Sequence, residues 1–158
     1  MIRKAEPHDI PRLTELLLAT NAIHSAGRPD LFKEGGIKYD AEALGVLLED
    51  HQRPVFVYVD DDDKVLAYAF CIYQFNKETT SIYARKTLYI DDFCVDEAYR
   101  GQHIGKELYN FVCDVAKKRN CHNVTLHVWQ CNEIASKFYD AMGMTPLYTT
   151  METVVNEF

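Results

Sequence analysis

The sequence lacks any stretch of apolar residues long enough to cross a bilayer, since its longest such run, 65–75, is too short for a membrane-spanning helix. Glycine and proline are sparse, at 7 and 5 of 158 residues, which excludes a collagen-like or linker-rich chain. Basic residues are outnumbered, with 17 Lys and Arg against 24 Asp and Glu and a net charge of −7. Nucleic acids and anionic membranes attract basic surfaces. We therefore expect no nucleic-acid and no membrane partner, and the acidic balance favours a cationic co-substrate.

The chain also has no Cys-x-x-Cys pair, and its five cysteines are an odd number, which is typical of a reducing compartment. Residues 1–7 lack the apolar core of a secretory signal, so we expect a cytoplasmic protein. Cys121-His122 and the later pair His127 and Cys131 suggest a metal site. His122 and His127 would, however, point to opposite faces of the strand expected there. We therefore expect no metal.

The composition, 47% apolar and 26% charged, predicts one globular domain over residues 1–158. Apolar residues at helical spacing predict helices from Asp9 to about His24, from Asp40 to Leu48, over 104–119 and over 133–142. Period-two and continuous apolar runs predict strands over 2–5, 55–59, 65–75, 87–95, 124–129 and 144–155. This order of elements predicts an α/β (α+β) sandwich with a mixed sheet.

A loop with two glycines joins the strand ending at Val95 to the clearest helix. Free N–H groups at a helix N-terminus and the helix dipole favour a bound anion, and a cation flanks each end of the loop. The alternative is a tight loop whose glycines serve only the backbone. As an anion cradle it would use Arg100, Gly101, Gln102, His103, Ile104, Gly105 and Lys106.

A second motif follows, and the two together resemble the GCN5-related N-acetyltransferase (GNAT) family. In that family Arg/Gln-x-x-Gly-x-Gly/Ala binds the coenzyme A pyrophosphate, and Asn-x-x-Ala-x-x-Phe-Tyr-x-x-x-Gly lies beside the thioester. The first pattern is matched at Arg100 and Gly105, but His103 replaces a glycine, so its β-carbon could crowd the phosphate or require a different backbone angle. The second pattern is matched at Asn132, Ala135, Phe138, Tyr139 and Gly143.

The resemblance implies a mostly antiparallel sheet with helices on both faces, and acetyl-CoA as co-substrate without a metal. It implies that the backbone of Phe93, Cys94 and Val95 pairs with the pantetheine arm, that Asn132 holds the pantetheine amide, and that Tyr139 protonates the leaving sulfur. The reaction implied is direct transfer of an acetyl group from acetyl-CoA to a primary amine. Two alternatives stay open: Phe138 and Tyr139 as an ordinary aromatic core pair, and a non-catalytic acyl-CoA-binding or regulatory domain on the same fold.

Two adjacent carboxylates, Asp91 and Asp92, interrupt an otherwise apolar strand and resemble the Leu-Glu-Asp of diamine acetyltransferases. A carboxylate there can bind an ammonium and accept its proton, whereas the structural alternative is a bond to backbone or to an arginine such as Arg85. Successive strand residues face opposite ways, so only a bulge would direct both into one cleft. We expect Asp91 to face the acceptor and Asp92 to serve a structural hydrogen bond.

The acceptor is expected to be the amine of a small cationic molecule or of a protein. In this fold the segment between the first two helices borders the acceptor cleft, which makes His24, Arg28, Asp30 and Phe32 candidate substrate-binding residues. A homodimer is compatible with this interpretation.

Overall fold

A five-stranded sheet organises the protein in a computed structural model that describes residues 1–156. Along the sheet the order is β1 (Ile2–Lys4), β2 (Val55–Val59), β3 (Val65–Asn76), β4 (Arg85–Val95) and β5 (Asn123–Leu126). The pairs β1–β2, β2–β3 and β3–β4 are antiparallel, whereas β4 and β5 run parallel. The predicted mixed, mostly antiparallel sheet is confirmed.

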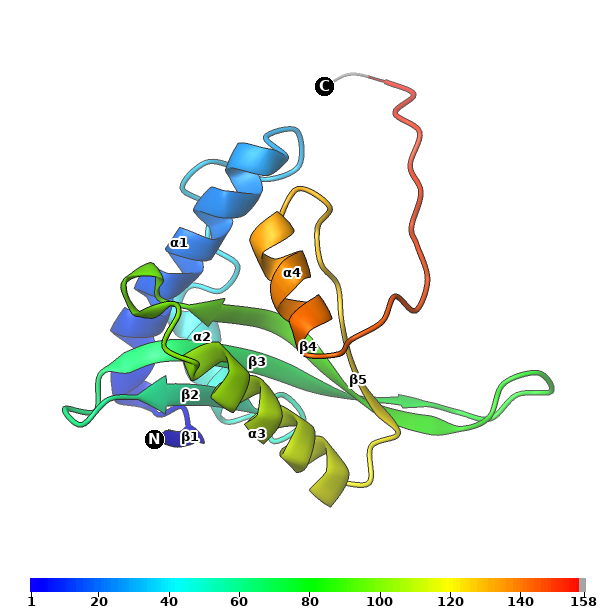
Figure 1. Ribbon diagram of the computed structural model, residues 1–158, viewed down its shortest axis with the longest axis horizontal. Coiled ribbons are helices and arrows are strands. Elements are labelled where there is room, and N and C mark those ends of the chain that lie inside the picture. The colour runs from blue at the N-terminus through cyan, green and yellow to red at the C-terminus, as the bar shows by residue number, and fades with distance from the viewer. Residues whose placement is uncertain (157–158) are drawn as a thin grey trace.

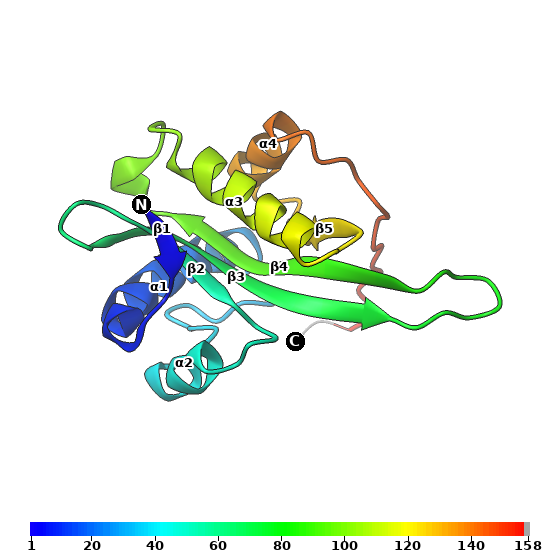
Figure 2. The ribbon, with the colours of Figure 1, turned by 90° about the horizontal axis from the view of Figure 1, so that it is seen from below.

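Helices cover both faces of this sheet, as predicted (Figures 1 and 2). One face carries α1 (Ile10–Gly27) and α2 (Ala41–Leu48), and the other carries α3 (Ile104–Lys118) and α4 (Glu133–Ala141). Short 3-10 helices, η1 (Pro7–Asp9) and η2 (Glu97–Tyr99), precede α1 and α3. The Asp40 side chain accepts a hydrogen bond from the Ala43 N–H at 2.8 Å, so it caps α2 as its sequence position predicts.

Alternation along β3 divides the core into two layers. Tyr68 and Phe70 belong to the cluster under α1 and α2, whereas Ala67, Ala69 and Cys71 belong to the cluster under α3. All five side chains are at most 2% exposed. Because β3 is covered on both faces, its sequence is a continuous apolar run. Burial of these side chains is the main contribution to the stability of the fold.

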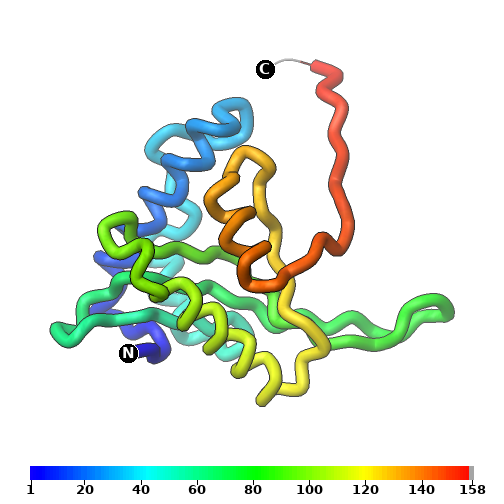
Figure 3. Tube along the Cα trace, viewed as in Figure 1, coloured from blue at the N-terminus to red at the C-terminus, as the bar shows by residue number. Residues whose placement is uncertain are grey.

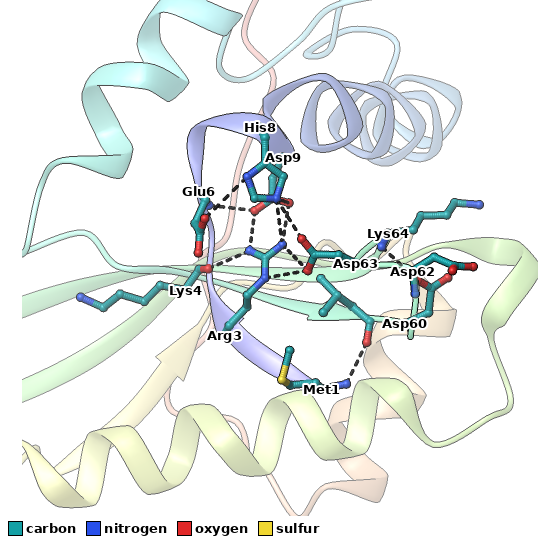
Figure 4. A network of polar contacts seen from close by, with 11 residues as sticks. Met1, Arg3, Lys4, Glu6, His8, Asp9, Asp60, Asp62, Asp63 and Lys64 are labelled. Carbon is teal, nitrogen blue, oxygen red and sulfur yellow. Dashed lines mark hydrogen bonds and ion pairs between the residues drawn. The ribbon is translucent and has the colours of Figure 1, made fainter.

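An ionic network ties the first strand to the turn between β2 and β3 (Figure 4). Arg3 donates to both carboxylate oxygens of Asp9, at 2.7 and 3.0 Å, and to Asp63 in the acidic turn at 2.8 Å. Asp9 also accepts from the Glu6 N–H at 2.8 Å, which satisfies a carboxylate that is almost fully buried. Asp63 of this turn thus has a structural role.

Strands β4 and β5 separate before β4 ends. Their pairing stops at Ile90 opposite Leu126, but β4 continues to Val95. Beyond this point no strand formed by residues 1–156 covers the backbone of β4 on the β5 side. β5 ends at Leu126 and is shorter than the predicted 124–129. This separation opens the edge of the sheet beside the two aspartates.

The predicted closing strand over 144–155 is wrong. Residues 144–156 follow α4 as an extended segment that runs apart from the sheet (Figures 1 and 3). Its apolar composition suggested a strand, but a strand also needs a pairing edge, and Pro146 removes a ladder donor near its start. The large apolar side chains of this segment stay exposed: Leu147, Tyr148, Met151, Val154 and Val155.

None of the helices within residues 1–156 has the length and hydropathy that a bilayer crossing requires. The same residues contain no group of three or more His, Cys, Asp or Glu side chains placed to hold a metal ion.

Candidate active site

A β-bulge in β4 decides where the two aspartates point. Phe70 pairs with Asp92 and the next β3 residue, Cys71, pairs with Ile90, so Asp91 is an extra residue without a partner on β3. Ile90 faces the α3 layer, and alternation therefore directs Asp91 to the α1 and α2 face. Because the bulge resets the alternation, Asp92 faces the same way. The expectation that the two carboxylates lie on opposite faces is wrong.

Asp91 is held by residues from the loop between α1 and α2. Its Oδ2 accepts from the Tyr39 hydroxyl at 2.6 Å and lies 3.0 Å from the Lys38 ammonium. Tyr39 is fixed in turn, because Arg53 donates to its hydroxyl at 2.8 Å and its ring stacks on Phe70 at 5.6 Å. Burial, followed by the bond to Asp91, raises the pKa of Tyr39, so the phenol remains a donor. The cation that meets the carboxylates is thus Lys38 and not Arg85.

Asp92 lies deeper, with its side chain 10% exposed. Its Oδ1 accepts from the buried Tyr68 hydroxyl at 3.1 Å, and that hydroxyl also contacts Thr20 Oγ1 at 3.1 Å. The structural hydrogen bond expected for Asp92 is therefore present. Burial raises the pKa of Asp92, while the charge of Lys38 and the Tyr68 bond act in the opposite direction. A carboxylate with a raised pKa in a site that binds ammonium is suited to accept a proton.

Tyr139 belongs to α4, which covers the opposite face of the sheet. It lies on α4 beside Phe138, with ring centroids 5.2 Å apart, and edge-on to Phe93 at 6.3 Å. Burial raises the pKa of Tyr139, and the charge of Asp92 adds to this effect. The phenol therefore stays protonated at neutral pH and is available only as a proton donor. Tyr139 is both part of an aromatic cluster and electrostatically linked to Asp92.

The loop before α3, which was predicted as an anion cradle, contains two left-handed residues. Gly101 and His103 both have positive φ, at 77° and 64°, and His103 is the N-cap of α3. The positive φ explains why glycine suits position 103. Gly105 has a different reason: an added β-carbon would lie 3.2 Å from Phe138 Cε2 and 3.3 Å from Val95 Cγ2. Gly105 thus allows α3 to pack closely against α4 and β4.

We expect His103→Gly to stabilise the protein by about 0.5–1 kcal/mol. The left-handed conformation costs an L-residue about 1–2 kcal/mol, which glycine avoids. Glycine also gives the unfolded chain more conformational entropy, and this offsets part of the stabilisation. Urea midpoints measure the change. The adjacent Gln102→Gly is the matched control and should lose stability, since Gln102 has no positive φ to relieve. Equal midpoints for wild type and His103→Gly would contradict this account.

The remaining predicted cofactor residues occupy the open edge and the start of α4. Phe93, Cys94 and Val95 lie where β4 has left β5, so no strand within residues 1–156 pairs with them on that side. Arg100 Nε donates to the Val95 carbonyl at 3.2 Å, at the cradle end of this edge. The Asn132 Oδ1 caps α4 by accepting from the Ala135 N–H at 3.1 Å. Its amide nitrogen is the group left to hold a ligand carbonyl.

The four predicted substrate-binding residues divide into two pairs. His24 and Phe32 have ring centroids 5.0 Å apart, and Phe32 meets Trp129 edge-on at 5.2 Å. Burial, and then the charge of Lys38, lowers the pKa of His24. Arg28 and Asp30 instead pair with each other at 2.7 Å, and Arg28 also binds Glu152 at 2.8 Å. Arg28 thus links this loop to the C-terminal segment, and neither residue contacts the two aspartates of β4.

Sequence reasoning missed several residues of this site: Lys38, Tyr39, Arg53, Tyr68 and Trp129. Lys38 and Tyr39 lie in an irregular loop with no periodic signal. Tyr68 reads as an ordinary core residue of a buried strand. Only the fold brings Lys38, Tyr39 and Tyr68 to the two aspartates.

Comparisons with known proteins find named N-acetyltransferases among the similar sequences. The bovine "thialysine N-epsilon-acetyltransferase" is 33% identical over 67 residues, covering 42% of this chain and 39% of its own length. The human "spermidine/spermine N(1)-acetyltransferase-like protein 1" is 26% identical over 155 residues, covering 92% of this chain and 20% of its own length. The chain thus spans well under two thirds of these curated relatives.

Whole-chain similarity extends to a solved structure. The crystal structure of a mutant of the BH1408 protein from Bacillus halodurans superposes with a TM-score of 0.94 at 27% identity, covering 99% of both chains. The model of the family described as "Acetyltransferase (GNAT) family" matches residues 17–144, which is most of the sequence and includes both motifs, the bulged strand and the loop that carries Lys38. The chain belongs to the acetyltransferase (GNAT) family.

Proposed function

We propose that the protein transfers an acetyl group from acetyl-CoA directly to a primary amine of a small cationic molecule or a protein. The observation that carries this proposal is the bulge, which places Asp91 and Asp92 on one face where they bind an ammonium group, that of Lys38. An acceptor amine must be bound as a cation and then lose a proton before it can attack. The two adjacent carboxylates provide a group for each task.

The residues of the cradle and the open edge of β4 fit acetyl-CoA as co-substrate. The N–H groups at the start of α3, with Arg100 and Lys106, would hold its phosphates, and the backbone of residues 93–95 would pair with its pantetheine arm. When bound, acetyl-CoA supplies an activated acetyl group. Gly101 leaves open space, since an added β-carbon there would meet no atom within 4 Å.

In the proposed reaction Asp91 orients the acceptor and Asp92, directly or through water, takes a proton from its ammonium. The neutral nitrogen then bonds to the acetyl carbon as the carbon–sulfur bond breaks. Tyr139 gives its proton to the departing sulfur, and the proton lost by the amide nitrogen replaces it through solvent. Burial raises the pKa of Cys94, so its thiol is poorly suited to carry the acetyl group, which supports direct transfer.

Acetyl-CoA should raise the melting temperature, because a ligand of the native state stabilises it. Lys106→Glu should reduce this shift by bringing a negative charge to the cradle. Lys118→Glu, the same change at the opposite end of α3, is the control and should leave the shift intact. Gly105 is a poor test position because a side chain there would disturb Phe138 and Val95.

Thiol release with a panel of amines then separates catalysis from binding. Release with a diamine or a lysine peptide supports the proposal. A thermal shift without release for any amine would identify a non-catalytic acyl-CoA-binding domain, the alternative on this fold. The absence of both would overturn the assignment of the cradle.

We also propose a homodimer. The C-terminal segment exposes a row of large apolar side chains, and β5 pairs on one edge only within the described residues. A second copy could cover both features. Light scattering of the purified chain measures its mass, and a monomer at all concentrations would refute the proposal.

A further inference from the structure

Lys38 binds both carboxylates of the proposed acceptor site. Its ammonium donates to the backbone carbonyl of Asp91 at 2.8 Å, and lies 3.0 Å from Asp91 Oδ2 and 3.8 Å from Asp92 Oδ2. Within residues 1–156 no other lysine or arginine forms an ion pair with either carboxylate. One hydrogen bond to a backbone carbonyl and ion pairs with two carboxylates therefore hold this primary ammonium.

The Lys38 side chain is easily released from this position. It is 40% exposed and comes from residues 28–40, which form neither helix nor strand. A partly exposed ion pair contributes little net free energy. Its neighbour Tyr39 is anchored by the Arg53 bond, the Asp91 bond and the stack on Phe70. The Lys38 side chain can therefore swing away while the loop stays attached through Tyr39.

A second ammonium could not join Lys38 at these oxygens without strong repulsion. Two unit charges about 4 Å apart near a protein surface repel by about 4 kcal/mol. If an acceptor ammonium is to reach Asp91 and Asp92, the Lys38 ammonium has to leave. The two cations then compete for one position.

We propose that Lys38 is a resident competitor, which occupies the acceptor position when the site is empty and is displaced by the acceptor amine. This inference rests on the proposed function and specifies its substrate class: a primary ammonium at the end of an unbranched alkyl chain, as in a polyamine or a lysine side chain. The position already holds such a group. A quaternary ammonium, which has no N–H donor, would not replace its hydrogen bonds.

Lys38→Met tests the competition because methionine keeps an unbranched chain and removes the charge. Isothermal titration with spermidine and with a lysine-containing peptide should show binding about two- to fivefold tighter than in wild type, and the acceptor KM should fall in parallel. Lys38→Arg should weaken binding, since a guanidinium can hold carboxylates with two parallel bonds. Choline should bind poorly to every variant.

Lys33→Met is the matched control, because Lys33 is an exposed lysine of the same loop and the substitution changes the net charge equally. It should change spermidine binding less than twofold. The acetyl-CoA thermal shift shows that each variant is folded. Any of three results would overturn the proposal. Spermidine binding could be unchanged or weaker in Lys38→Met, it could tighten equally in Lys33→Met, or no variant could bind spermidine.

The titration also separates this inference from the proposed function. If no variant releases thiol from acetyl-CoA but Lys38→Met still tightens spermidine binding, transfer fails as the function and the competition stands. If thiol is released at wild-type KM in Lys38→Met and binding is unchanged, transfer stands and the competition fails.

Discussion

Asp92→Asn is expected to lower kcat at neutral pH by about a hundredfold to ten-thousandfold, the range for a lost general base. Asparagine keeps the size of the side chain and can still accept from Tyr68, so the site should remain intact. The acid limb of the kcat profile should disappear in this variant, and part of the activity should return at high pH, where the acceptor amine is already neutral. Rates at saturating acetyl-CoA between pH 5 and pH 10 measure both effects.

Stability should change in the opposite direction to activity. The folded state raises the pKa of Asp92 above its unfolded value, so its contribution to stability is complete below the unfolded pKa and is lost as pH rises through the folded pKa. Asparagine carries no charge and avoids this loss. We therefore expect the urea midpoint of Asp92→Asn at pH 7 to equal or exceed that of wild type, and the difference to shrink toward pH 4.

Asp91→Asn is the matched control, as the same change on the adjacent residue. Asp91 holds the ammonium position and the Tyr39 hydroxyl, so its loss should mainly raise the acceptor KM, by about tenfold, while the acid limb remains. If Asp91→Asn removes the acid limb and Asp92→Asn leaves kcat unchanged, Asp91 is the base. Two unaffected variants would refute any role for these carboxylates in catalysis.

The bulge in β4 leaves a trace in the sequence, but the trace is too weak to predict the bulge. Apolar residues that face the α3 layer occur at 88, 90, 93 and 95, and this change from even to odd positions is what an inserted residue causes. Tyr89 and Cys94 are also apolar, however, so the sequence does not display the change of parity clearly. Regular alternation is the usual pattern of a strand, and it is interrupted at Asp91. The proposed chemistry needs this interruption, because it brings both carboxylates to one face.

The other differences come from contacts between distant segments. The glycine loop with α3, and α4 with its N-cap, are predictable because each is a local motif at a helix start. Lys38 and Asp91 lie far apart in the sequence, and no pattern in an irregular loop indicates which of its residues will meet a strand. The closing strand failed for a related reason: residues 144–155 have the composition of a strand, but pairing depends on an edge that composition does not describe.

Tyr139→Phe is expected to lower kcat by about tenfold to a thousandfold, with the acetyl-CoA Kd changed less than twofold. Phenylalanine keeps the ring contacts with Phe93 and Phe138 and removes only the hydroxyl. Because burial and the charge of Asp92 raise the pKa of Tyr139, the phenol remains protonated throughout the working range, so the loss should be nearly constant with pH. Steady-state rates from pH 6 to pH 9 measure this.

A second tyrosine of the same aromatic cluster provides the control for this substitution. Tyr109 lies on α3 and meets the Phe138 ring edge-on at 6.4 Å, and burial raises its pKa to about 12. Tyr109→Phe removes a hydroxyl from the same cluster, on a residue that the mechanism does not use, and should leave kcat within about twofold. An equal loss of kcat in the two variants would mean that each hydroxyl affects the rate only through the packing of the cluster. An unchanged kcat in Tyr139→Phe would mean that the thiolate leaves without a proton from this residue, and Tyr139 would then be part of the core alone.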